Sequence, residues 1–287
     1  MIKSLLLTAA TFTAITPALA QEASSWTSAY AGGRLGYSWQ PKDGSERLDF
    51  DTNRDGRFGD TVRTAAGADA FSPGFCGAEG TTSLPAGGCA DDKDAVTYTG
   101  MVGFDYQLPN IAGGGIVVGV VAEYGNSHVN DSVTGFSTTP ANYVLTRSLR
   151  GTGAVRARAG YGFNDTLVYG TGGLAYGRVR TRFGTTNNAN AFVDANGDDA
   201  RQNSYKDDRW GYTVGGGVEQ RIGEHFSIGA LYGFTSLADG KYRLGVERGT
   251  APATNPFLLA NSTGTDLRRS HSRFVRHDVT VTAAYRF

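Results

Sequence analysis

A short acidic stretch in the first third of the chain carries the side-chain oxygens and the glycine of a calcium-binding loop. Asp51, Asn53 and Asp55 precede Gly56 in the D-x-N-x-D-G spacing that arranges oxygen ligands around calcium. The glutamate that completes an EF-hand loop is absent, although Asp60 stands two positions before its place. Two interpretations stay open: a partial calcium site formed by Asp51, Asn53, Asp55 and Asp60, or a turn rich in Asx side chains that bond their own backbone.

The chain contains two cysteines, Cys76 and Cys89. A chain that is exported meets an oxidising compartment, where such a pair is expected to form a disulfide. That bond would close a short loop, and the alternative is two free thiols.

Catalysis finds little support among the side chains that could carry it. The four histidines, His128, His225, His271 and His277, are scattered, and only His271 has a serine on both sides, in Ser270-His271-Ser272. Nucleophilic catalysis needs a base and a hydroxyl held together, which this spacing does not provide. We therefore predict no catalytic residues and no enzyme activity.

The N-terminus has the order of regions that a secretory signal requires. Lys3 is followed by the apolar stretch Leu5–Ile15 and then by Ala18-Leu19-Ala20. The alternative, an uncleaved anchor, would need about 20 apolar residues to cross a bilayer as a helix. We predict that residues 1–20 are a signal peptide cleaved after Ala20, which leaves 21–287 as one domain.

Composition excludes two classes of protein. No later segment approaches the length of a transmembrane helix, and the 41 glycines with 29 tyrosines and phenylalanines suit strands better than helices. The 27 basic residues equal the 27 acidic residues, so the chain lacks the basic excess that a nucleic-acid binder needs. Nucleic acid is not an expected partner.

The C-terminal segment alternates strictly between two faces up to its last residue. Val279, Val281 and Tyr285 share one face with Phe287, while charged and polar residues occupy the other. A strand that ends the chain on an apolar-face Phe resembles the signature read by the outer-membrane barrel-assembly machinery. We therefore interpret Phe287 as an assembly signal.

Seven further segments alternate in the same way. They are residues 30–39, 96–108, 115–124, 149–163, 167–183, 208–222 and 226–234. In segment 149–163 the pattern places Leu149 and Val155 on the apolar face, with Arg150 and Arg156 on the opposite face. In segment 167–183 it places Leu167 and Tyr169 on the apolar face.

The connections alternate in length. They are long at about 40–95, 125–147, 184–207 and 238–273, and short elsewhere. This asymmetry predicts an all-β protein, an eight-stranded antiparallel transmembrane barrel with short periplasmic turns and long extracellular loops.

The inward face of this predicted barrel is rich in charge. It carries Arg34, Asp105, Glu123, Arg156, Arg158, Glu219, Arg276, Asp278 and Arg286. These are too many charges for the dry ligand cup of a soluble eight-stranded barrel. We expect them to pair across the lumen as a plug, and the alternative is an arginine-lined pore that favours anions.

Three stretches resemble a known family. The segments RSLRGTGAVRARAGYGFNDTLVYGTGGLAYG, WGYTVGGGVEQRIGEHFSI and VTVTAAYRF are similar to the β-barrel domain of the RopB-like family of small Gram-negative outer-membrane proteins. The long first loop with DTNRDGRFGD and a cysteine pair resembles the longer, surface-antigen branch of that family. The resemblance implies a structural surface protein, sometimes grouped with porins, and it implies no catalytic residues.

The leading hypothesis is therefore a structural barrel of the cell outer membrane that supports the envelope and displays long surface loops. Its expected partners are outer-membrane lipid and lipopolysaccharide, the barrel-assembly machinery, and a host or environmental surface ligand. No cofactor is expected apart from the calcium named above. The alternative is a narrow porin for small solutes, which should show lumen charges in bands of opposite sign rather than facing pairs.

Overall fold

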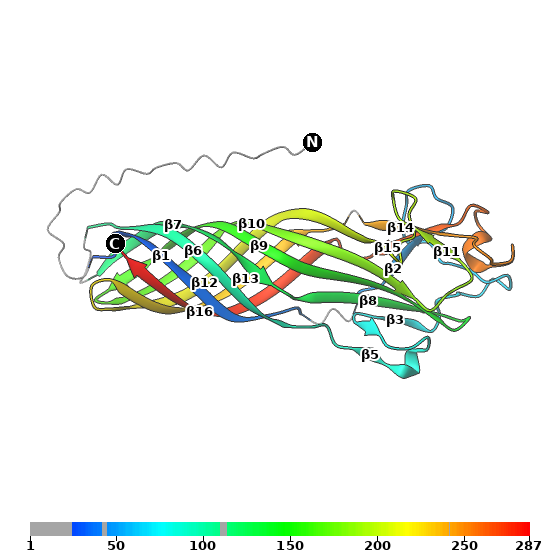
Figure 1. The fold of residues 1–287 in the computed structure, drawn as a ribbon, viewed down its shortest axis with the longest axis horizontal. Coiled ribbons are helices and arrows are strands. Elements are labelled where there is room, and N and C mark those ends of the chain that lie inside the picture. The colour runs from blue at the N-terminus through cyan, green and yellow to red at the C-terminus, as the bar shows by residue number, and fades with distance from the viewer. Residues whose placement is uncertain (1–24, 42–44, 110–113, 241) are drawn as a thin grey trace.

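The computed structural model describes residues 25–41, 45–109, 114–240 and 242–287. The chain forms an elongated barrel with a second, compact assembly of connections at one end (Figure 1). The predicted signal peptide and its cleavage site lie outside the described residues. That segment and the domain boundary after it stay predictions.

Eight long antiparallel strands close the barrel. They are β1 (Ser28–Trp39), β6 (Ala95–Gln107), β7 (Gly114–Ser127), β9 (Ala141–Phe163), β10 (Thr166–Thr185), β12 (Ser204–Ile222), β13 (Phe226–Ala238) and β16 (Arg273–Arg286). Each pairs with the next, and Leu35 of β1 lies opposite both Tyr98 of β6 and Val281 of β16. Because β1 joins the last strand to the second, the predicted eight-stranded barrel is confirmed.

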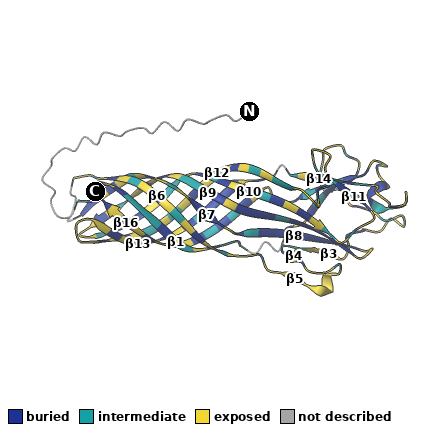
Figure 2. Ribbon diagram, viewed as in Figure 1, coloured by how far each residue is buried: buried dark blue, intermediate teal, exposed yellow. Residues whose placement is uncertain are grey.

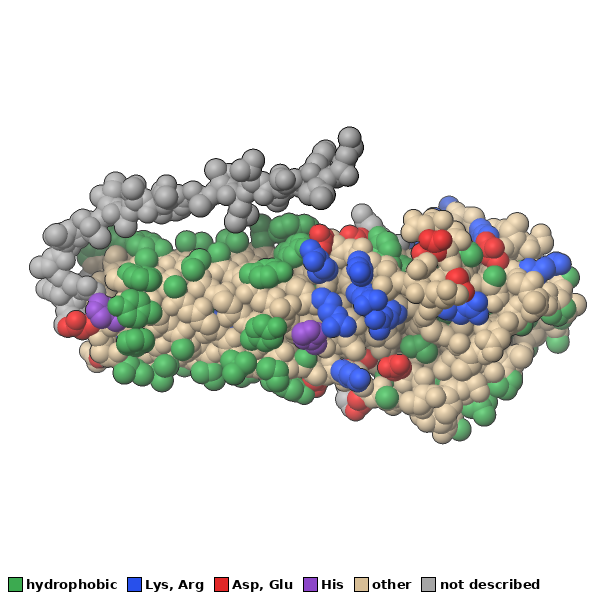
Figure 3. Space-filling view, in the orientation of Figure 1, with side chains coloured by type: hydrophobic (Ala, Val, Ile, Leu, Met, Phe, Trp, Pro, Cys, Tyr) green, Lys and Arg blue, Asp and Glu red, His purple; other side chains and the backbone are tan. Residues whose placement is uncertain are grey.

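The outer face of the barrel is an apolar belt. Side chains alternate between exposed and buried along each strand, which gives the chequered pattern of Figure 2. Leu35 is 61% exposed, Val281 64% and Leu174 66%, and Figure 3 shows hydrophobic side chains around the barrel in view. Such a surface suits lipid rather than water as its solvent.

Short turns join the strands at the end that we call the turn end. Asn164 and Asp165 connect β9 to β10, and Gly223 begins the connection from β12 to β13. Asn164 has a φ of 49° and Gly223 a φ of 67°, the left-handed region that asparagine and glycine tolerate. The third short connection, after β6, lies partly outside the described residues.

The long connections meet at the opposite end, which we call the loop end, and fold into a cap. We define the cap as the described residues among 45–94, 130–141, 186–203 and 239–272. Its main sheet has the order β11 (Ala191–Val193), β14 (Arg243–Glu247), β15 (Thr265–Arg269) and β2 (Leu48–Asp51). Its other elements are β3 (Gly74–Cys76), β4 (Glu79–Gly80), β5 (Cys89–Ala90), β8 (Asn130–Ser137), η1 (Pro85–Gly87) and η2 (Pro256–Leu258).

Helix is almost absent from the described part of the chain. The elements η1 and η2 are single 3-10 turns. None of the helices among the described residues is long and apolar enough to cross a membrane.

The cap has its own hydrophobic core. The ring of Phe71 lies 4.4 Å from that of Phe50, 5.3 Å from that of Tyr143 and 6.0 Å from that of Phe257. These residues belong to a buried cluster that also takes in Phe192. Since the cluster draws on every long connection, the loops form one packed body.

The predicted second loop, 125–147, is wrong over most of its length. β7 continues to Ser127, and β8 with the first part of β9 forms a hairpin that carries the sheet beyond the barrel. In that hairpin Leu145 and Val133 are buried in the cap core. The strands are therefore longer than the span that a membrane requires.

A bulge in β9 reverses the predicted faces of that strand on the loop-end side. Thr152 pairs with Gly177 and Leu149 with Val179, so Arg150 and Gly151 together face the single residue between them on β10. Leu149 is consequently buried inside and Arg150 exposed outside, the reverse of the prediction.

The predicted faces of β10 are also reversed. Leu167, Tyr169 and Val179 are buried inside, while Val168 and the arginines at 178 and 182 are exposed outside. Apolar residues inside β10 misled the prediction, because the lumen contains apolar layers as well as charge.

Replacing Phe71 by Ala should open the cap while leaving the barrel closed. Removing a buried aromatic ring typically costs about 3–5 kcal/mol, and here the whole loss falls on the cap core. We expect lower hydrogen-exchange protection in 45–94 with unchanged heat-modifiable gel migration. The matched control is Leu84→Ala, an exposed site, and equal protection in the two variants would contradict a shared cap core.

Candidate functional site

The lumen near the turn end holds a closed set of four ions. Arg286 donates from Nη2 to Asp105 at 3.0 Å and to Glu219 at 2.7 Å, and Arg158 donates to Glu219 at 2.9 Å. Arg158 Nε also lies 3.3 Å from Asp105. All four side chains are almost fully buried, so each charge depends on its neighbours for compensation.

Aromatic rings complete this end of the lumen. The guanidinium of Arg286 lies 4.6 Å from the ring centre of Trp26, which is fully buried, and that of Arg158 lies 4.2 Å from the ring of Tyr169. Trp26 is held by its backbone N–H, which donates to Gln107 Oε1 at 2.7 Å. The cation–π contacts add to the stabilisation of the buried arginines.

A second ionic layer lies further along the lumen. Glu123 accepts from both Arg34 and Arg156, and Arg276 lies 3.4 Å from Asp278. The space between these groups is a cavity of about 30 Å³. With the first layer, the structure thus places all nine charges predicted to face the lumen in ion pairs with one another.

An apolar layer separates these ions from the cap. It consists of Val129, Leu149, Ala175, Val179, Leu237 and Phe274. All six side chains are buried. In the two ionic layers on the turn-end side of this layer, arginines and carboxylates are intermixed and are not segregated into bands of one sign.

A third ionic layer joins the barrel to the cap. Arg147 of β9 pairs with Asp131 of β8 and, at 3.1 Å, with Asp239, while Arg269 of β15 pairs with Asp131 and Glu46. This layer was not predicted from the sequence, because its residues fall in segments predicted to be long connections. A signal was present, since Arg147 stands between Leu145 and Leu149 at the spacing of a strand.

Burial and charge determine the proton affinities of this third layer. Burial acts to raise the pKa of Asp131, but Arg147 and Arg269 outweigh it and hold that pKa below its usual range. Asp92 lies beside it, where its Oδ1 accepts from the Ser132 N–H at 2.8 Å. Burial, followed by the charge of Asp131, raises the pKa of Asp92 to about 7.

The predicted calcium residues lie together in the cap. Asp51 accepts from the backbone N–H groups of Asp55 at 3.1 Å and Gly56 at 2.8 Å, and Asn53 accepts from Asp55 N–H at 3.0 Å. Asp60 instead accepts from Thr52. Within the described residues, no three His, Cys, Asp or Glu side chains form a group that could hold a metal. The geometry matches the Asx-rich turn, and calcium binding stays a prediction.

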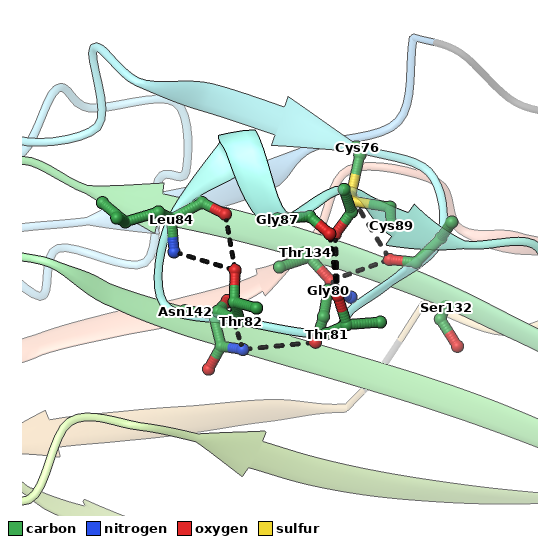
Figure 4. Close-up of a disulfide and its surroundings, with 12 residues drawn as sticks. Cys76, Gly80, Thr81, Thr82, Leu84, Gly87, Cys89, Ser132, Thr134 and Asn142 are labelled. Atoms are coloured by element: carbon green, nitrogen blue, oxygen red, sulfur yellow. Dashed lines mark hydrogen bonds between the residues drawn. A yellow bond between two sulfur atoms is a disulfide. The ribbon is translucent and has the colours of Figure 1, made fainter.

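The cysteine pair is joined. Cys76 and Cys89 form a disulfide with a Cα–Cα distance of 6.7 Å. The loop that it closes is fastened to the hairpin below, because Gly80 N–H donates to Thr134 Oγ1 at 2.7 Å and Asn142 Nδ2 donates to Gly80 O at 3.3 Å (Figure 4). The bond therefore secures a segment that the cap core does not cover.

The remaining predicted residues lie apart from these layers. His277 is on the outer face of β16, stacked on Trp39, and His225 follows the turn after β12. Phe287 is 70% exposed at the turn end, where its N–H donates to Ala29 O at 3.0 Å. Its role in assembly stays a prediction.

Replacing Glu219 by Gln should destabilise the barrel by about 3–5 kcal/mol, because Arg158 and Arg286 would each lose a buried partner. Glu247→Gln is the control, since Glu247 is a half-exposed carboxylate 4.0 Å from Arg54, where a loss of at most about 1 kcal/mol is expected. Urea unfolding in detergent micelles, followed by tryptophan fluorescence, measures both. Equal urea midpoints for the two variants would show that the ion pairs in the lumen stabilise the barrel no more than an exposed ion pair does.

Cap stability should fall as the pH rises from about 4 to about 7. In that window the folded cap keeps the Asp92 proton while an unfolded chain, with an Asp pKa of about 3.9, has lost it. Asp92→Asn should remove this fall, and Asp198→Asn, at an exposed position, should leave it. Hydrogen-exchange protection factors of 45–94 at about pH 5 and about pH 7.5 provide the test. A fall of the same size in Asp92→Asn would place its origin elsewhere.

Comparisons with known proteins agree with this geometry. Residues 6–287 match the family model described as outer membrane protein beta-barrel domain. The chain is 31% identical over 137 residues to the 31 kDa outer-membrane immunogenic protein of Brucella melitensis, covering 47% of this chain and 51% of that protein. It is 29% identical over 172 residues to the 22 kDa outer membrane protein of Rhizobium leguminosarum, covering 59% and 66%. The chain thus spans about half the length of the Brucella relative.

Among solved structures, Ail, the attachment invasion locus protein of Yersinia pestis, aligns over 91% of this chain and 99% of its own, with a TM-score of 0.34 and 10% identity. The complex of Ail with the heparin analogue sucrose octasulfate gives a TM-score of 0.32 and 12% identity. The assignment rests on the family model, which spans nearly the whole chain. A closed barrel with an apolar outer belt and this family match together show that the protein belongs to the outer membrane protein beta-barrel domain family and resides in the outer membrane.

Proposed function

We propose that the chain is a closed structural barrel that holds its cap outside the cell, where the cap supports the envelope and meets a host or environmental ligand. The observation that carries the proposal is the filling of the lumen by facing ion pairs and an apolar layer. A barrel filled in this way serves as a support for what it carries.

The lumen argues against the porin alternative. Anion passage would need arginines that water can reach, but Arg158 and Arg286 are engaged by Asp105 and Glu219. A cavity of about 30 Å³ offers room for little more than a water molecule. Opening a path would require breaking buried ion pairs, each of which is costly to separate.

The structure of the cap supports a role in displaying a surface outside the cell. Its aromatic core and its disulfide give it a defined surface, and the long connections gather at the end opposite the short turns, an asymmetry typical of outer-membrane barrels. A recess of about 240 Å³ lies among Phe71, Tyr143, Phe257 and the uncharged side chains of Thr138 and Asn187. It would suit an uncharged ligand.

The membrane-facing parts account for the other partners. An outer-membrane barrel contacts lipid and lipopolysaccharide through its outer face. The exposed C-terminal Phe287 would present the residue that the barrel-assembly machinery reads.

The first arm of the test is planar-bilayer conductance of the refolded mature chain, with a porin in the same bilayers as positive control. We expect a folded, heat-modifiable barrel that is electrically silent. Reproducible conductance steps would overturn the closed barrel and favour the porin.

The second arm tests which end faces outward. Both native cysteines are joined, so an introduced cysteine is a unique thiol. Thr254→Cys, exposed in the cap, should react on intact cells with a maleimide that does not cross membranes, whereas Asp165→Cys, exposed at the turn end, should not. Labelling of Asp165→Cys alone would reverse the proposed orientation.

A further inference from the structure

We propose that the outer face of β9 and β10, just beyond the apolar belt, binds the phosphate groups of lipopolysaccharide. The site is a groove whose cations are Lys93, Arg150 and Arg182. It lies outside the lumen and does not depend on the barrel being closed, but it rests on the proposed orientation, because lipopolysaccharide occupies the outer leaflet of the membrane.

The bulge in β9 creates the site. On the turn-end side of the bulge, even-numbered residues such as Thr152 and Arg156 line the lumen. Beyond it the alternation is shifted by one residue, so Arg150 points outward and Leu149 inward. Without the bulge the guanidinium of Arg150 would enter the lumen, as the sequence pattern alone predicts.

The groove itself is large and polar. It has a volume of about 490 Å³, and besides the three cations it is lined by Asn130, Thr146 and Ser148, with Glu79 as its single carboxylate. Among the described residues, none of Lys93, Arg150 and Arg182 forms an ion pair. Their donors are therefore available, and guanidinium groups match phosphate oxygens in charge and in bidentate geometry.

The positive charge continues along the same outer face. Arg180 of β10 lies directly opposite Lys206 of β12 in the sheet. Arg178 lies 3.2 Å from the carboxylate of Asp208 on the same outer face. Figure 3 shows Lys and Arg side chains gathered where the hydrophobic belt gives way to the cap. Cations this close together repel one another, and a bound polyanion would offset that repulsion.

The surroundings indicate a lipid rather than a free anion. On the turn-end side of the arginines, the same strands expose Leu174 and Val155. On β12, Trp210 is exposed, and its ring lies 5.3 Å from that of the half-buried Tyr176. Aromatic side chains at this level mark the boundary between hydrocarbon and headgroups in outer-membrane barrels. A molecule whose phosphate occupied the groove would lay its acyl chains along this apolar surface.

The test compares binding of diphosphorylated lipid A with that of the same lipid A after phosphatase treatment, using the refolded full barrel in detergent micelles and tryptophan fluorescence. The variant is Arg150→Gln with Arg182→Gln, and the matched control is Arg243→Gln with Arg248→Gln, which removes two exposed arginines of the cap. We expect the first variant to bind diphosphorylated lipid A at least about tenfold more weakly and the control to bind it unchanged. Arg150→Lys with Arg182→Lys keeps both charges and should retain most of the affinity.

Three results would overturn the proposal. They are equal affinity for the two forms of lipid A, unchanged affinity in the Arg150→Gln, Arg182→Gln variant, and competition by inorganic phosphate at concentrations as low as those of lipid A. Heat-modifiable gel migration verifies that each variant is folded. A silent or conducting barrel in bilayers leaves this result unaffected. Maleimide labelling of Asp165→Cys alone would overturn the proposed orientation without changing the affinities measured in micelles, so the two failures are distinguishable.

Discussion

A charge inside an eight-stranded barrel has no water to solvate it, and the rest of this structure follows from that constraint. The lumen of such a barrel is about as wide as the side chains that fill it. Each inward arginine must therefore find an acceptor, as Arg286 does with the carboxylates of Asp105 and Glu219, and as Arg221 does with the backbone carbonyl of Ser25. Satisfying these charges brings residues from distant strands into fixed contact and leaves little room for solute.

The same requirement extends beyond the barrel. Glu46 from the first connection and Asp131 from β8 pair with Arg147 of β9, and Arg269 from the last connection pairs with the same two carboxylates. Separating the cap from the barrel would leave these buried ions without their partners, which costs several kcal/mol for each uncompensated charge. The aromatic cluster and the ionic layer beneath it thus make the connections an extension of the barrel.

The outer face of the barrel contacts lipid on the turn-end side of the β9 bulge and water with lipid headgroups on its loop-end side. On the turn-end side, outward residues such as Val155 suit hydrocarbon, and beyond the bulge Arg150 suits water and headgroups. A single extra residue exchanges the faces of the strand. It keeps Arg150 out of a lumen in which the described arginines already have partners, and it places Leu149 in the apolar layer.

The eight strands, their order, the asymmetry of the connections and the nine inward charges could all be predicted from the amino-acid sequence. The strands and the inward charges follow from a period of two within single segments, and the asymmetry follows from the lengths of the stretches between those segments. The cysteine pairing also followed, since the chain offers only one pair. Apolar residues on the inner face of β10 defeated the same rule, because alternation does not say which face meets lipid.

The position of the bulge, the cap core and the ionic layer around Arg147 depend instead on the packing of segments that are distant in the sequence. The bulge depends on the register between β9 and β10, and register is a property of two strands together. The cap core joins Phe50, Tyr143, Phe192 and Phe257, which lie too far apart in the sequence for any periodicity to connect. Long-range packing of this kind has no local signature, because its free energy arises only when the closed barrel brings the connections together.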